Sequence, residues 1–340
     1  MVWLKFLLCL AIILFAGTKL ARYGDAIAEK SGLGRIWIGL ALLAFITSMP
    51  ELSTGVSAAA LVKLPDLTIG TIFGSCLFNL TILALLDVLH RRTPILSGVG
   101  WSHMISAGIG ILLILLAAGS ILGGEKFSGF ILGWVSIPSI IIIILYLVGV
   151  RQLFHFERKQ QLVQSQATPL LYSEVPARMV YLKFTLVTVA VIGTGIWLSF
   201  VGDEIARTYD WSASFVGSLL LAITTSMPEL VVTVAAVRLG AIDMAVAAIL
   251  GANMLDIIGI ALADLFYTQG PILFQPRSLV SDVHLTTAMV AVMMNLLVMV
   301  GIRFRQKRKA FIIISWYGPL LIGLYIFGAY ALFTSGIDLG

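Results

Sequence analysis

Two nearly identical stretches place carboxyl and hydroxyl groups beside a proline inside apolar sequence. They read AFITSMPEL (44–52) and AITTSMPEL (222–230). In each, a threonine and a serine precede a glutamate by four and three residues, a spacing that gathers side chains near one face of a helix. The residues are Thr47, Ser48 and Glu51 in the first stretch and Thr225, Ser226 and Glu229 in the second. Such an all-oxygen set favours hard cations, Ca²⁺ or Na⁺.

The proline of each stretch, Pro50 or Pro228, predicts a broken helix. Proline has no N–H group and its ring clashes with the carbonyl four residues earlier. The carbonyls of Ile46 and Thr224 are therefore expected to lose their helical partners. Four neighbouring carbonyls are expected to be disturbed, those of Ala44, Phe45, Ala222 and Ile223. In lipid, such carbonyls are costly unless they line a cavity or bind a ligand. Neither stretch contains His or Cys, which disfavours Zn²⁺ and Cu⁺.

A second pair of motifs follows each stretch, GSCLFN (74–79) and GANMLD (251–256). The first places Ser75 and Asn79 four residues apart, and the second places Ala252 and Asp256 at the same spacing. Asp256 is thus a third acid deep in an apolar run. Three carboxylates near one point cannot all ionise without cations, so one is expected to hold a proton, and Asp256 is the candidate.

The composition of the chain identifies a polytopic membrane protein. It has 340 residues, of which 59% are hydrophobic and 11% charged. Apolar runs of membrane-spanning length predict ten helices. These runs cover about 3–22, 34–62, 66–89, 99–122, 127–150, 179–206, 212–238, 242–266, 279–302 and 310–334. The first run also resembles a signal peptide, but the repeat described next includes it.

An internal repeat relates residues 17–87 to 195–264, first at an offset of 178 and then of 177. Self-similarity at a fixed offset indicates repeated structural units. We expect a first five-helix half at 1–150 with a repeat at about 37–87, a linker at 151–178, and a second half at 179–340 with a repeat at about 215–264. An odd number of spans inverts the second half, which is the architecture of secondary transporters with a binding site at the repeat interface. The predicted fold class is therefore all-α, with ten transmembrane helices in two inverted repeats.

The distribution of basic residues predicts orientation. With the N-terminus outside, all but five of the 22 Lys and Arg residues fall on the cytoplasmic side, as the positive-inside rule requires. The exceptions are Lys5, Lys63, Lys126, Arg207 and Arg277. The linker 151–178 is then cytoplasmic. The net charge of +5 is confined to loops and does not indicate nucleic-acid binding.

The remaining polar residues suggest structural roles. Asp66 and Asp243 begin apolar runs and are interpreted as N-caps. Asp87 and Asp264 end the same runs and are expected at the membrane interface. The four histidines fall in or near loops. No nucleophile and base pair is evident, so an enzyme is not expected.

The two motif pairs resemble the two α-repeats of the cation/Ca²⁺ exchanger superfamily, most closely its compact prokaryotic Na⁺/Ca²⁺ exchangers. The resemblance implies a Ca²⁺:Na⁺ antiporter in a prokaryotic plasma (inner) membrane that works by alternating access without a cofactor, with the first and sixth helices sliding as a gate. It implies that Glu51 and Glu229 bind Ca²⁺, helped by Thr47 and Thr225. It also implies Na⁺ sites completed by Ser48, Ser75, Ser226 and the carbonyls of Ala44 and Ala222, with Asn79 and Asp256 flanking the centre.

Three departures from the family pattern leave alternatives open. Ile46 and Thr224 stand where the family often has glycine, Ala252 stands where Ser75 has its counterpart, and no large regulatory insert is present. The missing hydroxyl leaves the coupling ion open, so an H⁺-coupled antiporter of Ca²⁺ or another divalent cation is the alternative. A channel with the acids as a selectivity ring is a third reading.

Overall fold

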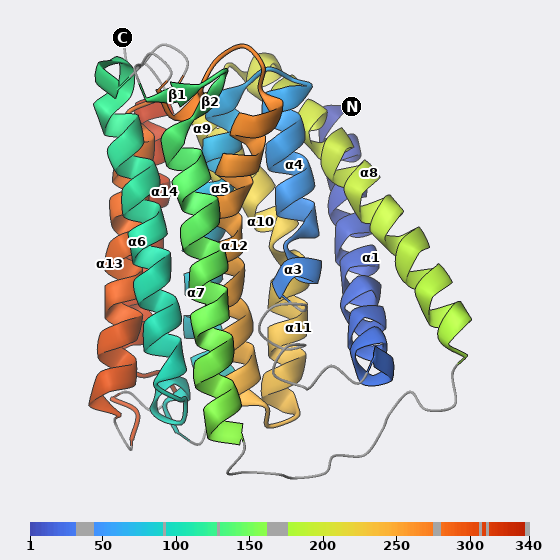
Figure 1. The fold of residues 1–340 in the computed structure, drawn as a ribbon, viewed down its shortest axis with the longest axis vertical. Helices are drawn as coiled ribbons and strands as arrows, with labels where there is room; N and C mark the ends of the chain where they lie inside the picture. Colours follow the sequence, from blue (N-terminus) through green and yellow to red (C-terminus); the bar gives the residue numbers. More distant parts are fainter. Residues whose placement is uncertain are drawn as a thin grey trace.

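The computed structural model describes residues 1–31, 44–90, 93–127, 130–161, 176–274, 280–305, 308–310 and 313–336. Within these ranges the protein is a bundle of long helices with one small hairpin (Figure 1). The long unbroken helices are α1 (Val2–Ser31), α5 (Pro65–Leu89), α6 (Ser102–Gly123), α7 (Ile137–Gln161), α8 (Ala177–Tyr209), α12 (Ile242–Phe266), α13 (Val283–Phe304) and α14 (Tyr317–Gly336). We call the end of the bundle that holds Val2, at the top of Figure 1, the upper end, and the opposite end the lower end.

Two further spans are built from short pieces. One contains α3 (Ala44–Thr47) and α4 (Met49–Ala60). The other contains α9 (Ala213–Phe215), the π-helix η4 (Val216–Leu221), α10 (Ala222–Thr225) and α11 (Met227–Arg238), and it bends by 41° between α10 and α11. The predicted run 34–62 is described only from Ala44 onward. Eight of the predicted spans thus correspond to long apolar helices and a ninth to the bent pair.

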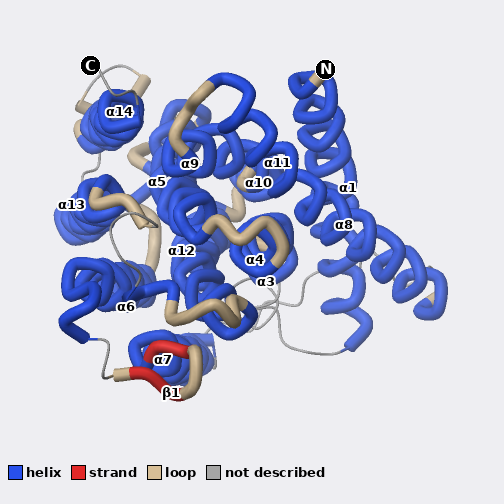
Figure 2. Tube along the Cα trace, turned by 90° about the horizontal axis from the view of Figure 1, so that it is seen from above, coloured by secondary structure: helices blue, strands red, loops and turns tan. Residues whose placement is uncertain are grey.

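The helices α5 and α12 form the centre of the molecule. Seen from above, they lie between the α1–α8 pair on one side and α6, α7, α13 and α14 on the other (Figure 2). Their burial agrees with this position, because 94% of the most apolar window of α12 is buried, compared with 22% in α7. Two equally apolar helices can differ this much only if the outer one faces lipid.

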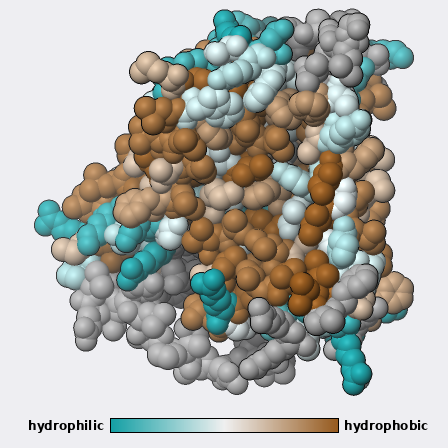
Figure 3. Space-filling view, turned by 180° about the vertical axis from the view of Figure 1, so that it is seen from behind, coloured by the Kyte–Doolittle hydropathy of each residue, from teal (hydrophilic) through white to brown (hydrophobic). Residues whose placement is uncertain are grey.

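The outer surface of the bundle is apolar. Large hydrophobic side chains such as Leu4, Leu147 and Phe327 are more than half exposed. On the face shown in Figure 3, hydrophobic residues dominate the middle and hydrophilic residues gather toward the two ends. An exposed apolar belt of this kind is stable in a bilayer and not in water.

Two of the predicted span boundaries were wrong. The runs 127–150 and 310–334 begin with loops, and their helices start only at Ile137 and Tyr317. In the first run, β1 (Ile131–Leu132) pairs with β2 (Val135–Ser136) in an antiparallel hairpin that turns at Gly133, whose φ is +67°. These residues are apolar enough to span a membrane. The glycine turn and the polar contacts described next nevertheless make the helix begin later in the chain.

Buried aspartates anchor both loops. Asp87 accepts hydrogen bonds from the Ser315 N–H (2.7 Å) and the Tyr317 hydroxyl (2.6 Å). At the other end of the bundle, Asp264 accepts from the Ser136 N–H (2.8 Å) and the Ser139 hydroxyl (2.7 Å). Each carboxylate also accepts from the backbone of a short 3₁₀ turn that follows its own helix, η2 (Ile95–Ser97) or η5 (Ile272–Phe274). Both aspartates are therefore structural.

The N-cap interpretation of Asp66 and Asp243 was wrong. The N-caps are Leu64 and Ala241, and neither aspartate caps its own helix. Asp66 instead accepts from His284 (Oδ1 to Nε2, 2.8 Å), and Asp243 contacts His103 at 2.9 Å. Both histidines are fully buried, although the sequence placed them near loops.

The predicted linker 151–178 begins as helix, because α7 continues to Gln161, and α8 starts at Ala177. Residues 162–175 lie outside the described residues. The division into two halves joined by this linker stays a prediction.

Candidate cation-binding site

The two proline-broken segments meet at the centre of the bundle. Each break falls on one serine with nearly the same backbone angles, φ −82° and ψ 7° at Ser48 and φ −83° and ψ 8° at Ser226. The proline follows two residues later in the first turn of the new helix, where its missing N–H costs nothing. The sequence thus breaks both helices at equivalent points and places a glutamate in the first turn beyond each break.

The glutamate of each segment is bonded to the serine of the other. The Ser226 hydroxyl donates to Glu51 Oε1 at 2.8 Å, and the Ser48 hydroxyl donates to Glu229 Oε1 at 3.2 Å. All four side chains are buried. The offset of 178 relates Ser48 to Ser226 and Glu51 to Glu229, so exchanging the two repeats converts one contact into the other.

Each glutamate retains one oxygen without a donor. Among the described residues, Glu51 Oε2 and Glu229 Oε2 are buried and have no hydrogen-bond partner. An unpaired buried carboxylate oxygen is costly, and this cost is removed when a cation or a proton binds. The unpartnered oxygens therefore fit a site for positively charged substrates.

The helices α5 and α12 supply further oxygens. Asn79 Nδ2 donates to Asp256 Oδ2 at 3.2 Å, and the other side-chain oxygens, Asn79 Oδ1 and Asp256 Oδ1, are buried without a partner in the described part of the chain. The Ser75 hydroxyl is buried and unpartnered as well. Asp256 and the two glutamates lie close enough to interact electrostatically.

The threonines and alanines of the motifs lie beside this cluster but have intrahelical partners. Thr47 and Thr225 donate to the carbonyls of Ala44 and Ala222, each at 3.2 Å. These carbonyls also accept the N–H groups of the serines at the breaks, at 3.0 and 3.1 Å. The expectation that the proline would disturb the carbonyls of Ala44 and Ala222 was therefore wrong, because the regular hydrogen bond persists up to the serine. Each carbonyl has a second lone pair that can still bind a cation.

The acidic groups alone do not form a metal site. Within the described ranges, no three His, Cys, Asp or Glu side chains lie close enough together to hold a metal ion. A cation at this centre must therefore also use hydroxyl, amide or backbone oxygens, which Ca²⁺ and Na⁺ accept readily.

Sequence reasoning missed one pair at the crossing of α5 and α12. Asn253 Nδ2 donates to the Cys76 carbonyl at 3.2 Å, and the Cys76 thiol contacts the Asn253 carbonyl at 3.8 Å. Both residues are buried and Asn253 Oδ1 has no described partner. The repeat offset of 177 aligns these two residues, so the signal was present in the sequence.

The upper half of the site is sealed by close backbone packing. A Cβ atom added to Gly74 of α5 would lie 2.2 Å from the Ser218 carbonyl oxygen, and one added to Gly217 of η4 would lie 2.6 Å from the Leu67 carbonyl oxygen. Ser214 of α9 donates a hydrogen bond to Asp66 at the upper end of α5. Only glycine permits this approach of α5 and η4.

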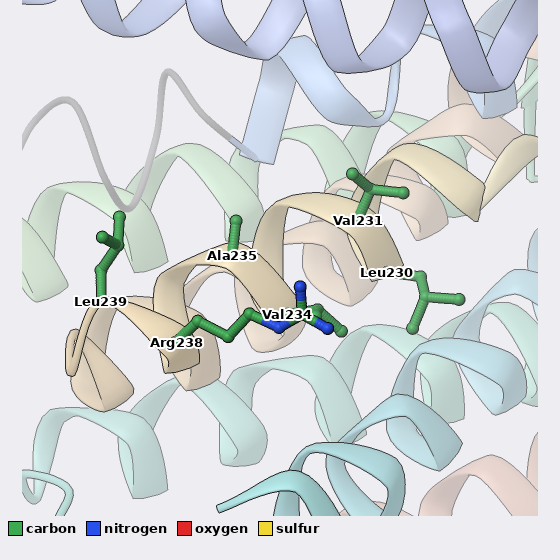
Figure 4. A pocket seen from close by; sticks show the side chains of 6 residues that line it. All are labelled: Leu230, Val231, Val234, Ala235, Arg238 and Leu239. Carbon is green, nitrogen blue, oxygen red and sulfur yellow. The ribbon is translucent and has the colours of Figure 1, made fainter.

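The lower half carries an apolar groove along α11. Its volume is about 470 Å³, and Figure 4 shows the side chains that line it. They are Leu230, Val231, Val234, Ala235, Arg238 and Leu239. Near this end α8 diverges from the rest of the bundle (Figure 1). Among the described residues, which do not include 32–43, the two ends of the molecule are therefore packed differently.

Comparison with known proteins assigns the family. The family model described as sodium/calcium exchanger protein matches residues 1–152 and 179–335. The chain belongs to this family and is accordingly a membrane protein of the cation-exchanger class.

Individual relatives share about a quarter of its residues. The sodium/calcium exchanger MaX1 of Methanosarcina acetivorans is 26% identical, with 95% of this chain and 96% of the relative covered. The inner membrane protein YrbG of Escherichia coli is 26% identical over 73% of this chain and 74% of the relative. The solved structure of the sodium-calcium exchanger NCX_Mj, soaked with Na⁺ and Sr²⁺, matches with a TM-score of 0.61 and 24% identity over 97% of this chain and 99% of that chain. This last likeness concerns the fold.

Proposed function

We propose that this protein is a secondary active antiporter that exchanges Ca²⁺ for Na⁺ by alternating access. The observation that carries the proposal is the reciprocal pair at the centre, in which each repeat donates a serine hydrogen bond to the glutamate of the other. Membership of the exchanger family supports it. The proposed architecture is ten spans in two inverted halves, because the central serine–glutamate contacts of the two repeats correspond to each other.

The buried oxygens would be shared by the two substrates. Glu51 and Glu229 hold Ca²⁺ between them, and their two negative charges balance one divalent ion. Na⁺ binds the same carboxylates with added oxygens from the two threonines, Ser48, Ser226 and Ser75, and from the carbonyls of Ala44 and Ala222. Asn79 and Asp256 flank this centre. Because both ions need the same ligands, they compete, and this competition couples their movement.

The gate is proposed to be the α1–α8 pair. The two helices are joined at the upper end by the Lys5–Glu204 ion pair (2.7 Å) and by a hydrogen bond from Trp3 Nε1 to the Tyr209 hydroxyl (2.7 Å). They pack against the broken spans through glycines at equivalent positions, Gly17 and Gly195. A pair tied in this way can move as one body.

The register of the two glycine contacts supports a sliding motion. Gly17 packs against Pro228, whereas Gly195 packs against Ser53 and Thr54, which lie three and four residues beyond the equivalent Pro50. The difference is about one helical turn, or about 5.4 Å. A slide of α1 and α8 toward the lower end by one turn would exchange the two registers. That step would open the sealed upper half and cover the groove of the lower half.

The orientation and location follow from charge. We propose that the upper end, with the N-terminus, faces outward and that the linker 151–178 is cytoplasmic, in the inner membrane of a prokaryote. The described conformation is then closed to the outside.

One observation favours a second candidate function, an H⁺-coupled antiporter of Ca²⁺ or a related divalent cation. Ala252 provides no hydroxyl where the first repeat has Ser75, and Asp256 provides an acid where the first repeat has Asn79. The second repeat is thereby poorer in Na⁺ ligands and richer in proton acceptors. A channel is disfavoured because the family to which the chain belongs is one of exchangers.

Uptake of ⁴⁵Ca²⁺ into proteoliposomes tests these proposals. Vesicles are loaded with Na⁺, with choline at matched pH, or with choline at acidic pH to create an outward H⁺ gradient. Uptake only from Na⁺-loaded vesicles supports Na⁺ coupling, and uptake only with the H⁺ gradient replaces it by the second candidate. Uptake that needs no counter-ion gradient and does not saturate would indicate a channel.

A further inference from the structure

The α4–α8 contact contains hydrogen bonds between the gate pair and the rest of the bundle. The Thr54 hydroxyl of α4 donates to the Gly195 carbonyl of α8 at 3.1 Å. One turn higher, the Ser57 hydroxyl lies 2.9 Å from the Ser199 hydroxyl, to which it can donate, and 3.1 Å from the Thr54 carbonyl of its own helix. The Ser199 hydroxyl donates in turn to the Ile196 carbonyl at 2.7 Å. Thr54 and Ser57 are buried, so water does not replace these bonds easily.

The helix α4, against which the gate helix α8 packs, is itself hydrogen-bonded to the central helix α5. Thr68 of α5 donates to the Gly55 carbonyl of α4 at 2.8 Å. Gly55 adjoins Thr54 in the chain, so the hydrogen bonds run without a break from the central helix α5 through α4 to the gate helix α8. We name the contacts of Thr54 and Ser57 with α8 the upper latch.

The second repeat lacks every one of these hydroxyls. At the offset of 178, Thr54 corresponds to Val232, Ser57 to Ala235 and Ser199 to residue 21, which is alanine. At the offset of 177, Thr68 corresponds to Ala245. Among the described residues no hydrogen bond joins α11 to α1, and the ring of Pro228 packs directly against Gly17.

We propose that Thr54 and Ser57 are positioning residues that bias the exchanger toward the conformation closed at its upper end. This inference rests on the proposed alternating access. Sliding the gate by one turn breaks both bonds of the upper latch, and the apolar α11–α1 contact provides no replacement. If both contacts were purely apolar, the two positions of the gate would have nearly equal energies. The hydroxyls in the α4–α8 contact make the energies of the two conformations unequal.

The size of the bias follows from ordinary interhelical hydrogen bonds. Such bonds in membrane proteins contribute enough to change an equilibrium by about threefold each. Loss of both should therefore shift the ratio of the two conformations by about tenfold. A pre-existing bias of this kind reduces the apparent affinity for ions at the disfavoured face by the same factor.

The test compares cysteine accessibility at the two ends of the protein. Val231→Cys places a thiol in the lower groove, and Ser218→Cys places one in the sealed upper contact. The native Cys9 and Cys76 are buried. Each reporter reacts with a membrane-impermeant maleimide in choline buffer, in nanodiscs that expose both faces, and the measured quantity is the ratio of the lower to the upper labelling rate.

The variant that removes the upper latch is Thr54→Val/Ser57→Ala, which gives α4 the residues that α11 has at the same positions. We expect the ratio to fall about tenfold. Ser120→Ala is the matched control, because the Ser120 hydroxyl donates to the Leu116 carbonyl of its own helix, α6, which lies on the opposite side of the bundle from α8 (Figure 2). An unchanged ratio in the double variant, or an equal change in the control, overturns the proposal.

A gain of function provides an independent measurement if the double variant folds poorly. Val232→Thr gives α11 a hydroxyl that can donate to the Gly17 carbonyl only after the gate has slid. We expect it to lower the labelling ratio about threefold, and an increase or no change contradicts the proposal.

The labelling assay involves no transported ion. Failure of Na⁺ coupling would appear in the ⁴⁵Ca²⁺ uptake experiment and leave the labelling result intact. Failure of the latch would appear only in the labelling ratio.

Discussion

The two repeats of this protein agree at the centre and differ at the flanks. Glu51 and Glu229 occupy the same environment, each bonded to the serine of the other repeat. One turn or more away, Asn79 faces Asp256, and Ser75 has only an alanine as its counterpart. If inverted repeats exchange their conformations during transport, identical central residues keep the binding site the same in both states. Differing flanks then set the energy difference between the states.

The same contrast holds for the two His–Asp contacts. Asp66 is only 18% exposed and also bonds Ser214 and the Ser281 N–H, whereas Asp243 is 64% exposed and bonds only His103 and the Gly100 N–H among the described residues. The upper contact thus joins three elements, and the lower contact joins a buried histidine to an exposed carboxylate. The counterpart of Ser214 in the first repeat lies outside the described residues.

Removing the central symmetry should have the largest effect. The double variant Glu51→Ala/Glu229→Ala loses both carboxylates that balance the charge of Ca²⁺, and we expect ⁴⁵Ca²⁺ exchange to fall to the level of empty vesicles. Asp210→Asn, at an exposed acid of the upper surface, serves as the control and should keep its exchange rate. Exchange that continues unchanged in the double variant would falsify the assignment of the site.

The two histidine contacts should differ in their contribution to stability. His284→Ala leaves a mostly buried carboxylate without its main donor, and we expect the free energy of unfolding to drop by about 2–3 kcal/mol. His103→Ala removes an equally buried ring but leaves an aspartate that is 64% exposed, so it should cost about 1–2 kcal/mol less than His284→Ala. Thermal unfolding in detergent measures both.

His284→Gln retains an N–H donor and should recover part of the loss. Equal destabilisation by the two alanine variants would show that the burial difference between Asp66 and Asp243 is unimportant.

Introducing a hydroxyl into the second repeat should increase the affinity for Na⁺. Ala252→Ser makes this position match Ser75, and one added oxygen ligand should lower the half-saturating Na⁺ concentration by about threefold. Ala261→Ser, a buried position further along α12, controls for the effect of adding a hydroxyl to this helix. A Na⁺ dependence that does not move in Ala252→Ser would favour the H⁺-coupled alternative.

The smallest effect is expected at the surface of the gate pair. Lys5 and Glu204 form an ion pair whose side chains are both 41% exposed, and exposed pairs contribute less than about 1 kcal/mol. Glu204→Gln should therefore shift the melting temperature by no more than a few degrees. A loss comparable to that of His284→Ala would mean that the ion pair, and not the packing of α1 on α8, joins the gate helices.

The sequence was informative wherever two copies of a pattern could be compared. The duplicated motifs predicted both helix breaks, and the structure places the breaks at Ser48 and Ser226. The apolar runs predicted most spans because membrane helices need a fixed hydrophobic length. The match to the exchanger family confirms the resemblance drawn from the same residues.

Contacts between distant elements could not be predicted in the same way. An aspartate near the start of a helix fits an N-cap, and only the position of α13 shows that Asp66 faces His284. The hydropathy of residues 131–136 is compatible with a helix, and only the buried Asp264 explains why a hairpin forms there instead. The roles of the site residues stay predictions until ions are bound and measured.

The reciprocal serine–glutamate bonds have a consequence for biosynthesis. Glu51 obtains its hydrogen-bond donor from Ser226, which is 175 residues later in the chain. At ordinary translation rates the ribosome needs roughly 10–35 s to make that segment. During this interval the first half stands in the membrane with its glutamate unpaired. Cellular machinery that inserts or protects nascent membrane helices must therefore tolerate a half-built protein whose polar centre is completed only when α10, α11 and α12 have been made.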